Sequence, residues 1–246
     1  YIVINKKKIT KEIYMSKKIK YGKSSFTLAE VLITLVIIGI IAAITVPVMM
    51  ANHRKTETAA RLKKFYSTLS NAIRLAEIDN GTTLSEWGNT AFDYVVNYLN
   101  ITEKDEDNDK YILTDGTTLT IGKASMGGLW TEGAPGPGPE TAYATMLTFD
   151  TNGDKKPNEI GRDRFIFYFV TGGQRTTASS YSRTQSGLVT NPWAYGENTT
   201  RSSLIERCIE TKQLVESSDF QYALGFCTEL VMRDGWEFKD DYPLKI

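Results

Sequence analysis

The chain has 246 residues, of which 41% are hydrophobic and 24% charged, as in an ordinary folded protein with room for one substantial core. Its formal net charge is zero, but residues 1–25 hold eight lysines and a single acid, so the remaining 21 basic and 28 acidic residues give the rest of the chain a net charge of −7. An acidic body argues against nucleic-acid binding, because phosphate contacts need Lys and Arg. A Lys-rich front end is instead typical of a segment that stays on the cytoplasmic side of a membrane.

Residues 1–25 are interpreted as a basic leader peptide. The sequence starts at Tyr1 and its first methionine is Met15, so we expect translation to begin at Met15 and residues 1–14 to be an untranslated extension. A longer leader with a different start is the alternative. The expected topology is the same in both cases, with the leader in the cytoplasm and the acidic body on the other side of the membrane.

Residues 26–48 form an apolar segment whose only ionisable residue is Glu30. The segment has the roughly 20 residues that a membrane helix needs, whereas a secretory signal has a shorter apolar region followed by a cleavage site of small residues. A carboxylate inside such a segment is costly unless it reaches the interface or finds a partner. Two interpretations are therefore open: Glu30 reaches the headgroups from the first helical turn, or it meets a positive charge during assembly.

The residues from Ser25 to Leu35, SFTLAEVLITL, resemble the prepilin-type cleavage and methylation motif of type IV pilins and type II secretion pseudopilins. The resemblance implies that a membrane aspartyl peptidase cuts before Phe26 and methylates the new amine. It also implies that Glu30 neutralises the terminal amine of a neighbouring subunit. Pro47 falls where the family has a helix-kinking proline. Ser25 departs from the Gly that the family usually has before the cut, although both residues are small.

The same resemblance implies the partners and the location of the protein. The partners are the prepilin peptidase, other pilin or pseudopilin subunits and an inner-membrane assembly platform; no nucleic-acid partner is expected. Before assembly, the protein is expected to be a single-pass inner-membrane protein with a periplasmic head, and afterwards part of a filament. The sequence leaves open whether that filament is an external pilus or a secretion pseudopilus.

Residues 49–80 are expected to continue the helix as an amphipathic segment, bent or loosened near Pro47. Apolar residues recur there at three- and four-residue steps, which describes one apolar stripe. Asn80-Gly81 is a typical helix stop. The stripe consists of Leu62, Phe65, Tyr66, Leu69, Ile73 and Ala76.

Residues 81–246 are expected to form an exported globular head, so the predicted fold class is α+β and pilin-like, with a small antiparallel sheet packed against the long N-terminal helix. Residues 111–121 predict a hairpin that turns at Asp115-Gly116, and residues 144–149 and 164–170 predict two strands. We expect a charged loop over residues 103–110 and a long surface excursion over residues 171–203. Helices are expected over residues 204–215 and 222–232, and a last strand over residues 235–238.

The connector between the two predicted strands, residues 150–163, is a candidate calcium loop. Asp150, Asn152 and Asp154 alternate as in the start of such loops, and Asp163 can act as a late ligand. The sixth and twelfth positions depart from the calcium pattern, and two lysines would repel a cation. Some type II pseudopilins bind calcium in a head loop, which supports the calcium interpretation by resemblance. The alternative is an Asx-rich turn without an ion, so the sequence predicts calcium as the one candidate cofactor.

Cys208 and Cys227 are the only cysteines. An even pair in an exported head predicts a disulfide, which would contribute about 3 kcal/mol by closing the loop between them. Many pilins have a disulfide loop near the C-terminus, so the resemblance points the same way. Two buried free thiols on neighbouring helices are the alternative.

The sequence favours a structural filament subunit and not an enzyme. The head contains no convincing catalytic set, and His53, the sole histidine, lies just beyond the apolar segment. The alternative is an exported protein or enzyme tethered by an uncleaved signal anchor, in which Glu30 would have no purpose. A DNA-binding minor pilin is a third interpretation, and the acidic body argues against it.

Overall fold

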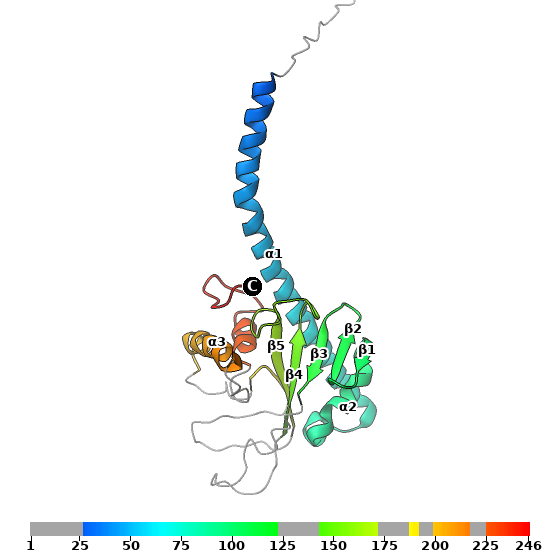
Figure 1. Cartoon of the computed structure of the whole chain (residues 1–246). Helices are drawn as coiled ribbons and strands as arrows, with labels where there is room; N and C mark the ends of the chain where they lie inside the picture. Colours follow the sequence, from blue (N-terminus) through cyan, green and yellow to red (C-terminus); the bar gives the residue numbers. More distant parts are fainter. Residues whose placement is uncertain (1–26, 123–142, 172–186, 192–198, 217–224) are drawn as a thin grey trace, which may run out of the picture. The chain divides into compact units, whose positions relative to one another are not determined.

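The computed structural model of the chain describes residues 27–122, 143–171, 187–191, 199–216 and 225–246 (Figure 1). The chain divides into two compact units, Tyr1–Val48 and Met49–Ile246, and each is described by itself. The cleavage site predicted between Ser25 and Phe26 lies outside the described residues. The fold is α+β: one long N-terminal helix is followed by an antiparallel sheet and further helices.

Helix α1 extends over Leu28–Asn80 and includes Pro47. The helical assignment continues across Pro47, although its nitrogen has no hydrogen to donate to the preceding turn. At the C-terminal end, Gly81 has a φ of 66° and its N–H donates to the carbonyl of Glu77 at 3.0 Å. A positive φ carries no penalty for glycine, so the predicted stop at Asn80-Gly81 is confirmed.

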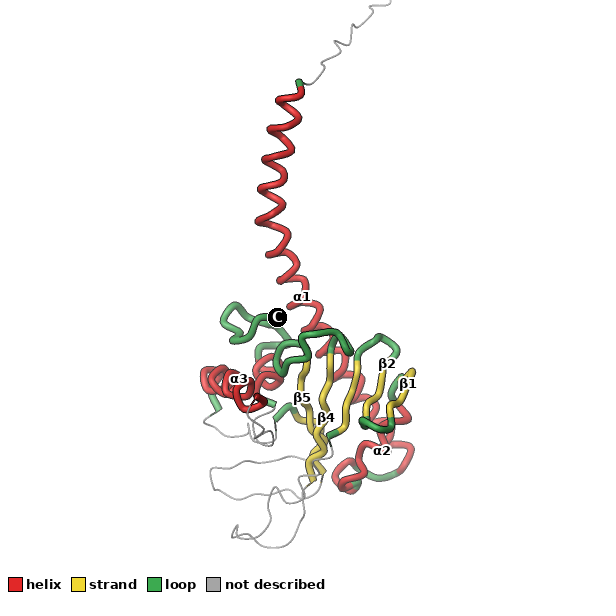
Figure 2. Tube along the Cα trace, viewed as in Figure 1, coloured by secondary structure: helices red, strands yellow, loops and turns green. Residues whose placement is uncertain are grey.

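The sheet is a six-stranded antiparallel meander in which each strand pairs with the next along the chain (Figure 2). The central pair, β4 and β5, is joined over eight residue pairs from Tyr143↔Thr171 to Asp150↔Arg164. The strands are β1 (Ile101–Asp105), β2 (Lys110–Leu113), β3 (Thr118–Ile121), β4 (Tyr143–Asp150), β5 (Arg164–Thr171) and β6 (Gly187–Val189).

The strands predicted over residues 111–121, 144–149 and 164–170 are present, and the structure adds two more, β1 and β6. The hairpin turning at Asp115-Gly116 joins β2 to β3, with Gly116 at a φ of 79°. The expectation of a purely charged loop over residues 103–110 was wrong, because Glu103 to Asp105 pair with β2 as part of β1. The expectation of an uninterrupted surface excursion over residues 171–203 was also wrong, because β6 lies within it. Both strands lie at sheet edges, and their sequence signals are weak because β1 is mostly charged and β6 has only three residues.

The segment of α1 that follows Met49 packs its apolar stripe on one face of the sheet (Figure 1). Phe65 stacks on Phe149 of β4 with 3.9 Å between ring centroids, and it contacts Phe167 of β5 at 5.2 Å. Side chains of β5 alternate between the two faces, as strand geometry requires. The face towards α1 carries Phe165, Phe167 and Phe169, and the other face carries Ile166, Tyr168 and Val170, all buried.

A short helical region between α1 and β1 closes one end of this core. Its first turn is capped by Thr83, whose backbone N–H donates to the Glu86 carboxylate at 2.7 Å. Phe92 of α2 contacts Tyr111 of β2 and Phe169 of β5. The region consists of the 3₁₀ turns Leu84–Glu86, Gly88–Thr90 and Val96–Tyr98 and of α2 (Ala91–Val95).

Helices α3 (Arg201–Glu216) and α4 (Phe226–Arg233) lie beside one another at the other side of the head (Figure 1). In α4, the hydroxyl of Thr228 accepts a hydrogen bond from the buried N–H of Ile166 at 3.0 Å. This bond satisfies a donor of β5 that the short strand β6 does not reach. The helix predicted over residues 222–232 is therefore present from residue 226, and residues 217–224 lie outside the described part.

The strand predicted over residues 235–238 was wrong, because these residues terminate α4. The N–H of Gly235 donates to Met232 and the N–H of Trp236 donates to Val231, which is the Schellman pattern. Both Gly235 and Trp236 have positive φ. Trp236 then packs on Tyr66 of α1 with 5.2 Å between centroids.

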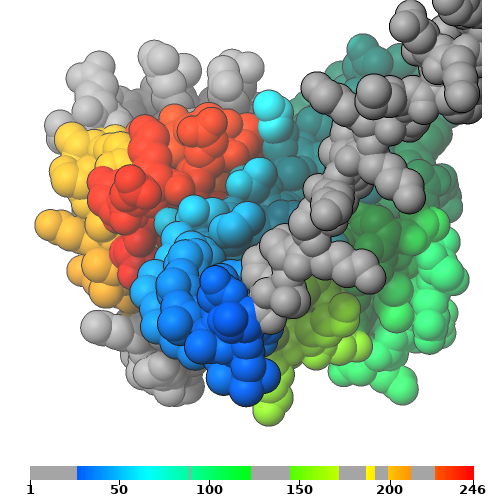
Figure 3. Space-filling view, turned by 90° about the horizontal axis from the view of Figure 1, so that it is seen from above, coloured from blue at the N-terminus to red at the C-terminus, as the bar shows by residue number. Residues whose placement is uncertain are grey.

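The C-terminal segment, residues 234–246, is joined to α3 by ion pairs and lies next to it in the space-filling view (Figure 3). The guanidinium of Arg201 donates to Asp234 at 2.8 Å and to Asp241 at 2.7 Å, and Lys239 pairs with Asp234 at 2.8 Å. The hydrogen bonds from Arg201, and then those from Lys239, hold the pKa of Asp234 below its ordinary value. Asp234 therefore stays ionised and keeps the segment attached at neutral pH.

We predict that Phe65→Ala lowers the free energy of unfolding of the head by about 3–5 kcal/mol, because it removes a buried ring and leaves a cavity against the sheet. Ser67→Ala, at an exposed position of the same helix, is the matched control and should change it by less than about 0.5 kcal/mol. Chemical unfolding of the full chain in detergent measures both. Equal effects from the two variants would contradict the assigned packing of α1.

Candidate processing and assembly site

The described part of the N-terminal unit begins at Thr27, which caps the first turn of α1. The Thr27 N–H donates to the Glu30 carboxylate at 2.8 Å and the Thr27 hydroxyl donates to the same oxygen at 3.0 Å. In return, the Glu30 N–H donates to the Thr27 hydroxyl oxygen at 3.2 Å. This reciprocal arrangement is a capping box, which satisfies N–H groups that a helix start leaves without partners.

The capping box gives Glu30 a local function that the sequence interpretation missed. The T-x-x-E spacing of Thr27 and Glu30 is itself the signal for such a box, and it was readable from the sequence. A cap, however, satisfies N–H groups and does not neutralise the carboxylate. Thr27 and Glu30 are both exposed, so Glu30 can reach a group outside its own chain.

Among the residues that the structure describes, α1 is the one helix long and apolar enough to cross a membrane, and none of its apolar window is buried within the chain. Large apolar side chains from Leu28 to Met50 are exposed, most of them by half or more. A surface of this kind needs lipid or other helices around it. A lone carboxylate near the centre of such a helix costs about 2.5–3.5 kcal/mol, and less near its end.

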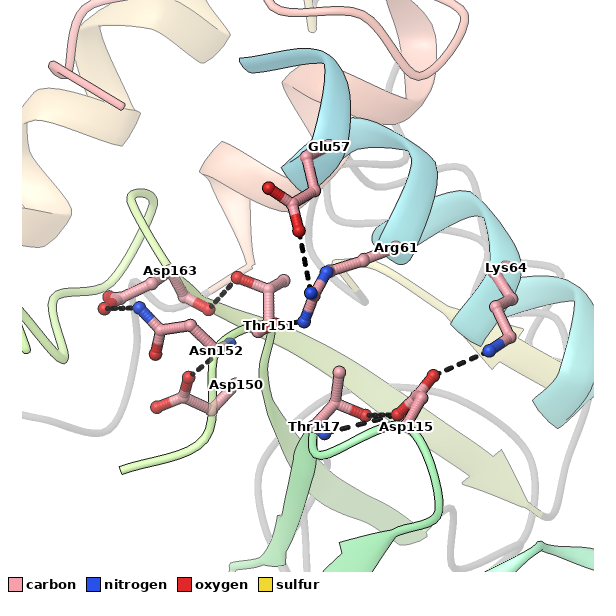
Figure 4. A network of polar contacts seen from close by, with 9 residues as sticks. All are labelled: Glu57, Arg61, Lys64, Asp115, Thr117, Asp150, Thr151, Asn152 and Asp163. Atoms are coloured by element: carbon pink, nitrogen blue, oxygen red, sulfur yellow. Dashed lines mark hydrogen bonds and ion pairs between the residues drawn. The ribbon is translucent and has the colours of Figure 1, made fainter. Parts of the chain in front are cut away.

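The head has a polar network where α1 passes the loop 150–163 (Figure 4). Arg61 of α1 donates to the carbonyl of Thr151 at 2.5 Å and is paired with Glu57 at 2.7 Å. Thr151 is tied across the loop, because its N–H donates to the carbonyl of Asp163 at 2.8 Å. The loop is therefore fixed both to itself and to α1.

A second contact in Figure 4 joins α1 to the β2–β3 turn. Lys64 pairs with Asp115 at 2.7 Å, and the N–H and hydroxyl of Thr117 also donate to that carboxylate. Partial burial acts to raise the pKa of Asp115, but the bonds from Lys64 and Thr117 outweigh it and hold the pKa below its ordinary value. Arg61 and Lys64 thus hold α1 in register with the two connections that the sheet presents to it.

The structure brings three of the four predicted calcium ligands together. Asn152 donates its backbone N–H to Asp150 at 3.1 Å and its side-chain amide to Asp163 at 3.1 Å. Asp163 also accepts the N–H groups of Asn158 and Glu159, each at 2.7 Å. Asp154 lies apart from this group, is largely exposed and pairs with Lys110 of β2.

Two observations bear on whether this loop fits a cation. The side-chain oxygen of Asn152 is buried and makes no hydrogen bond within the described part of the chain. The amide of Asn158 lies 3.1 Å from a carboxylate oxygen of Asp150 and 2.9 Å from the carbonyl of Lys155. With its nitrogen there, the amide donates to both oxygens, and its own oxygen then faces donors, so this orientation satisfies both ends of the Asn158 side chain.

The pKa of the Asp150 carboxyl is raised from its ordinary value. Burial raises its pKa, and the nearby carboxylate of Asp163 adds to the rise; the bond from Arg164 at 3.0 Å and the N–H of Asn152 act against it. Within the described ranges no three His, Cys, Asp or Glu side chains gather, so a cation here would have two carboxylates and otherwise neutral oxygens as ligands. Such a set suits calcium better than a transition metal.

Cys208 of α3 and Cys227 of α4 form a disulfide with an S–S distance of 2.06 Å, and both are buried. The bond lies against the loop 150–163, because a Cβ on Gly161 would come within 2.7 Å of the Cys227 sulfur. The hydroxyl of Tyr242 donates to the Gly161 carbonyl at 2.6 Å. The loop, the disulfide and the C-terminal segment are therefore packed as one cluster.

The comparisons with known proteins agree with this division of the chain. Residues 21–46 match the model of the prokaryotic N-terminal methylation motif, the prepilin-type cleavage and methylation signature. The protein is thus a precursor of the pilin or pseudopilin type, as the resemblance of residues 25–35 predicted. Residues 48–246 match a second model over most of the chain, and the chain belongs to that family, the Family of unknown function (DUF6613). No curated protein and no solved structure matches the chain.

Proposed function

We propose that this protein is the structural subunit of a type IV pilus or a type II secretion pseudopilus, cut before Phe26 and polymerised through α1. The observation that carries the proposal is Glu30: it is the only ionisable residue in an otherwise apolar and fully exposed helix segment that matches the methylation motif. In a chain that only needed an anchor, this carboxylate would cap the first turn of the helix and do no more. A subunit that must find its neighbour in lipid gains a specific contact.

The energetics of charged groups in an apolar medium support Glu30 as the assembly residue. Cleavage before Phe26 would create an amine one residue before Thr27 and four residues before Glu30, at a similar depth in the membrane. In the apolar medium an amine and a carboxylate attract far more strongly than in water, and pairing relieves the desolvation of both. Each incoming helix would therefore lower, by this pairing, the free-energy cost of the unpaired charge in the helix added before it.

Pro47 also suits this function. It removes one backbone hydrogen bond at the end of the apolar segment, and the boundary between the two compact units follows it directly. The two family models also meet there, at residues 46 and 48. We propose that Pro47 allows the membrane segment to adjust during assembly while the head keeps its packing on the later part of α1.

Processing is tested on protein isolated from its own host. We predict a mature chain whose first residue is Phe26 and whose mass includes one added methyl group, as measured by intact-mass and N-terminal fragment analysis. A chain that retains the basic leader would contradict the proposal and would favour an uncleaved anchor. Ser25→Gly is the matched variant, and it should be processed at least as completely.

Assembly is tested by separating the two functions of Glu30. Glu30→Gln keeps an oxygen that can accept the Thr27 N–H but removes the charge, whereas Thr27→Val removes the capping hydroxyl and keeps the charge. We predict that Glu30→Gln abolishes filaments, as measured by sedimentation and electron microscopy, and that Thr27→Val reduces them far less. Normal filaments from Glu30→Gln would mean that Glu30 only caps the helix.

We also propose that the loop 150–163 binds calcium through Asp150, Asn152 and Asp163. We predict that millimolar calcium raises the thermal unfolding midpoint of the full chain in detergent and that chelation reverses the rise. Asp150→Asn should remove the calcium response, and Asp154→Asn, which changes an exposed carboxylate paired with Lys110, should keep it. An unchanged midpoint in the unaltered protein would show that the loop closes without an ion.

A further inference from the structure

Within the head, the side of α1 that faces away from the sheet exposes cations beside the apolar side chains of Leu75 and Ile78. Lys63 and Arg74 are exposed there, while Leu62, Phe65 and Leu69 are buried against the sheet. Lys63 and Arg74 are 11 residues apart, which places them on one side of the helix about 16 Å apart along its axis. Lys64 is paired with Asp115, and no ion pair of Lys63 or Arg74 is present within the described residues. We call Lys63 and Arg74 the basic face.

The hairpin of β1 and β2 carries the opposite charge. Glu103, Glu106 and Asp107 are exposed on it, and β1 is an edge strand of the sheet. The turn is held in shape by Asp105, which accepts bonds from the Asp107 N–H at 3.1 Å and from the Asn108 side chain at 2.8 Å. We call Glu103, Glu106 and Asp107 the acidic hairpin.

The basic face and the acidic hairpin do not neutralise each other within one chain. Of the three acids in the acidic hairpin, Glu106 has a described ion pair, and that pair is local, with Lys104 at 3.4 Å. The basic face points away from the sheet, whereas the hairpin lies at the edge of the sheet beside α2 (Figure 1). The two surfaces therefore lie on different sides of one head and are both accessible to another molecule.

We propose that the acidic hairpin of one subunit docks on the basic face of α1 in the next subunit. This inference rests on the proposed function, since the filament is what brings the two copies together. Identical heads from a chain with a net charge of −7 after the leader repel one another, so close packing requires acidic surfaces to meet basic ones. Anchoring in one membrane and one filament keeps the local concentration of heads high enough for exposed charges to pair.

The placement of the two surfaces also sets the symmetry of the contact. A surface that pairs with itself closes a dimer, but two different surfaces on one molecule make a head-to-tail contact that can repeat without limit. A filament needs head-to-tail contacts of this repeating kind. The neighbour on the basic face is accordingly a second copy of this chain and not a separate acidic protein.

Cysteine cross-linking in intact filaments tests the contact. The two native cysteines are already paired, so introduced thiols can be joined selectively. We predict that a double variant, K63C with E106C, yields a ladder of dimers, trimers and larger products after oxidation. The two single variants, expressed together, should yield only the mixed dimer, and each alone should stay monomeric. The matched control, K63C with E210C, places the second thiol on the exposed surface of α3 and should give no ladder.

Charge reversal gives an independent readout. E106K with D107K, and separately K63E with R74E, should each lower the yield of sedimented filaments roughly tenfold, and high salt should lower it in the unaltered protein. The combination of both reversals should restore the yield, because the signs are again opposite. Filaments that form normally but give neither cross-links nor a charge effect would overturn the docking alone. Failure to cleave before Phe26, with no filaments at all, would overturn the proposed function instead.

Discussion

Phe65 of α1 lies flat on Phe149 of β4 at 3.9 Å, and this stack fixes which side of the helix meets the sheet. Arg61 and Lys64, one turn before Phe65 and directly beside it, are then held at the rim of the contact, where they reach Thr151 and Asp115. Lys63 is left facing outward. The same rotation of one helix therefore determines the core, the attachment of two loops and the charge of the exposed side.

The two ends of α1 differ in how apolar side chains are distributed around the helix. Near Leu28 the side chains are apolar on all sides, and only Thr27 and Glu30 are polar, which fits a helix surrounded by lipid or by other helices. Beyond Met49 a single stripe is apolar and the rest is charged, which fits a helix packed on one face. A hydrophobic pattern that changes along one continuous helix indicates a change of environment along it.

The sequence predicted the parts of the fold that depend on strong local signals. The helix stop at Asn80-Gly81, the hairpin at Asp115-Gly116 and the aromatic strand around Phe167 all have such signals. It failed where the signal is weak or non-local. β1 is charged because it is an edge strand, and β6 is three residues long. Residues 235–238 have strand-like composition but terminate α4, because the backbone of Gly235 and Trp236 closes the helix.

The residues of the candidate site were likewise predictable where their signal is local and not where it depends on folding. Glu30, Pro47 and the methylation motif were readable because they are contiguous, and the T-x-x-E spacing at Thr27 was readable but overlooked. The loop 150–163 was only partly predictable. Alternation along the chain suggested Asp154 as a ligand, but the pairing of β2 with its neighbours brings Lys110 to it instead. The contribution of Asn158 depends on how the loop closes, which spacing alone does not reveal.

The packing of Gly161 against Cys227 and Tyr242 has a consequence for how the protein matures. Tyr242 donates to a carbonyl 81 positions earlier in the chain, so this contact forms only after nearly the whole chain has been synthesised. Once it has formed, both sulfurs are buried and no oxidase could reach them. The thiols must therefore be joined while the tail is still undocked, so the order of events during folding, and not only the final structure, determines whether the head is completed.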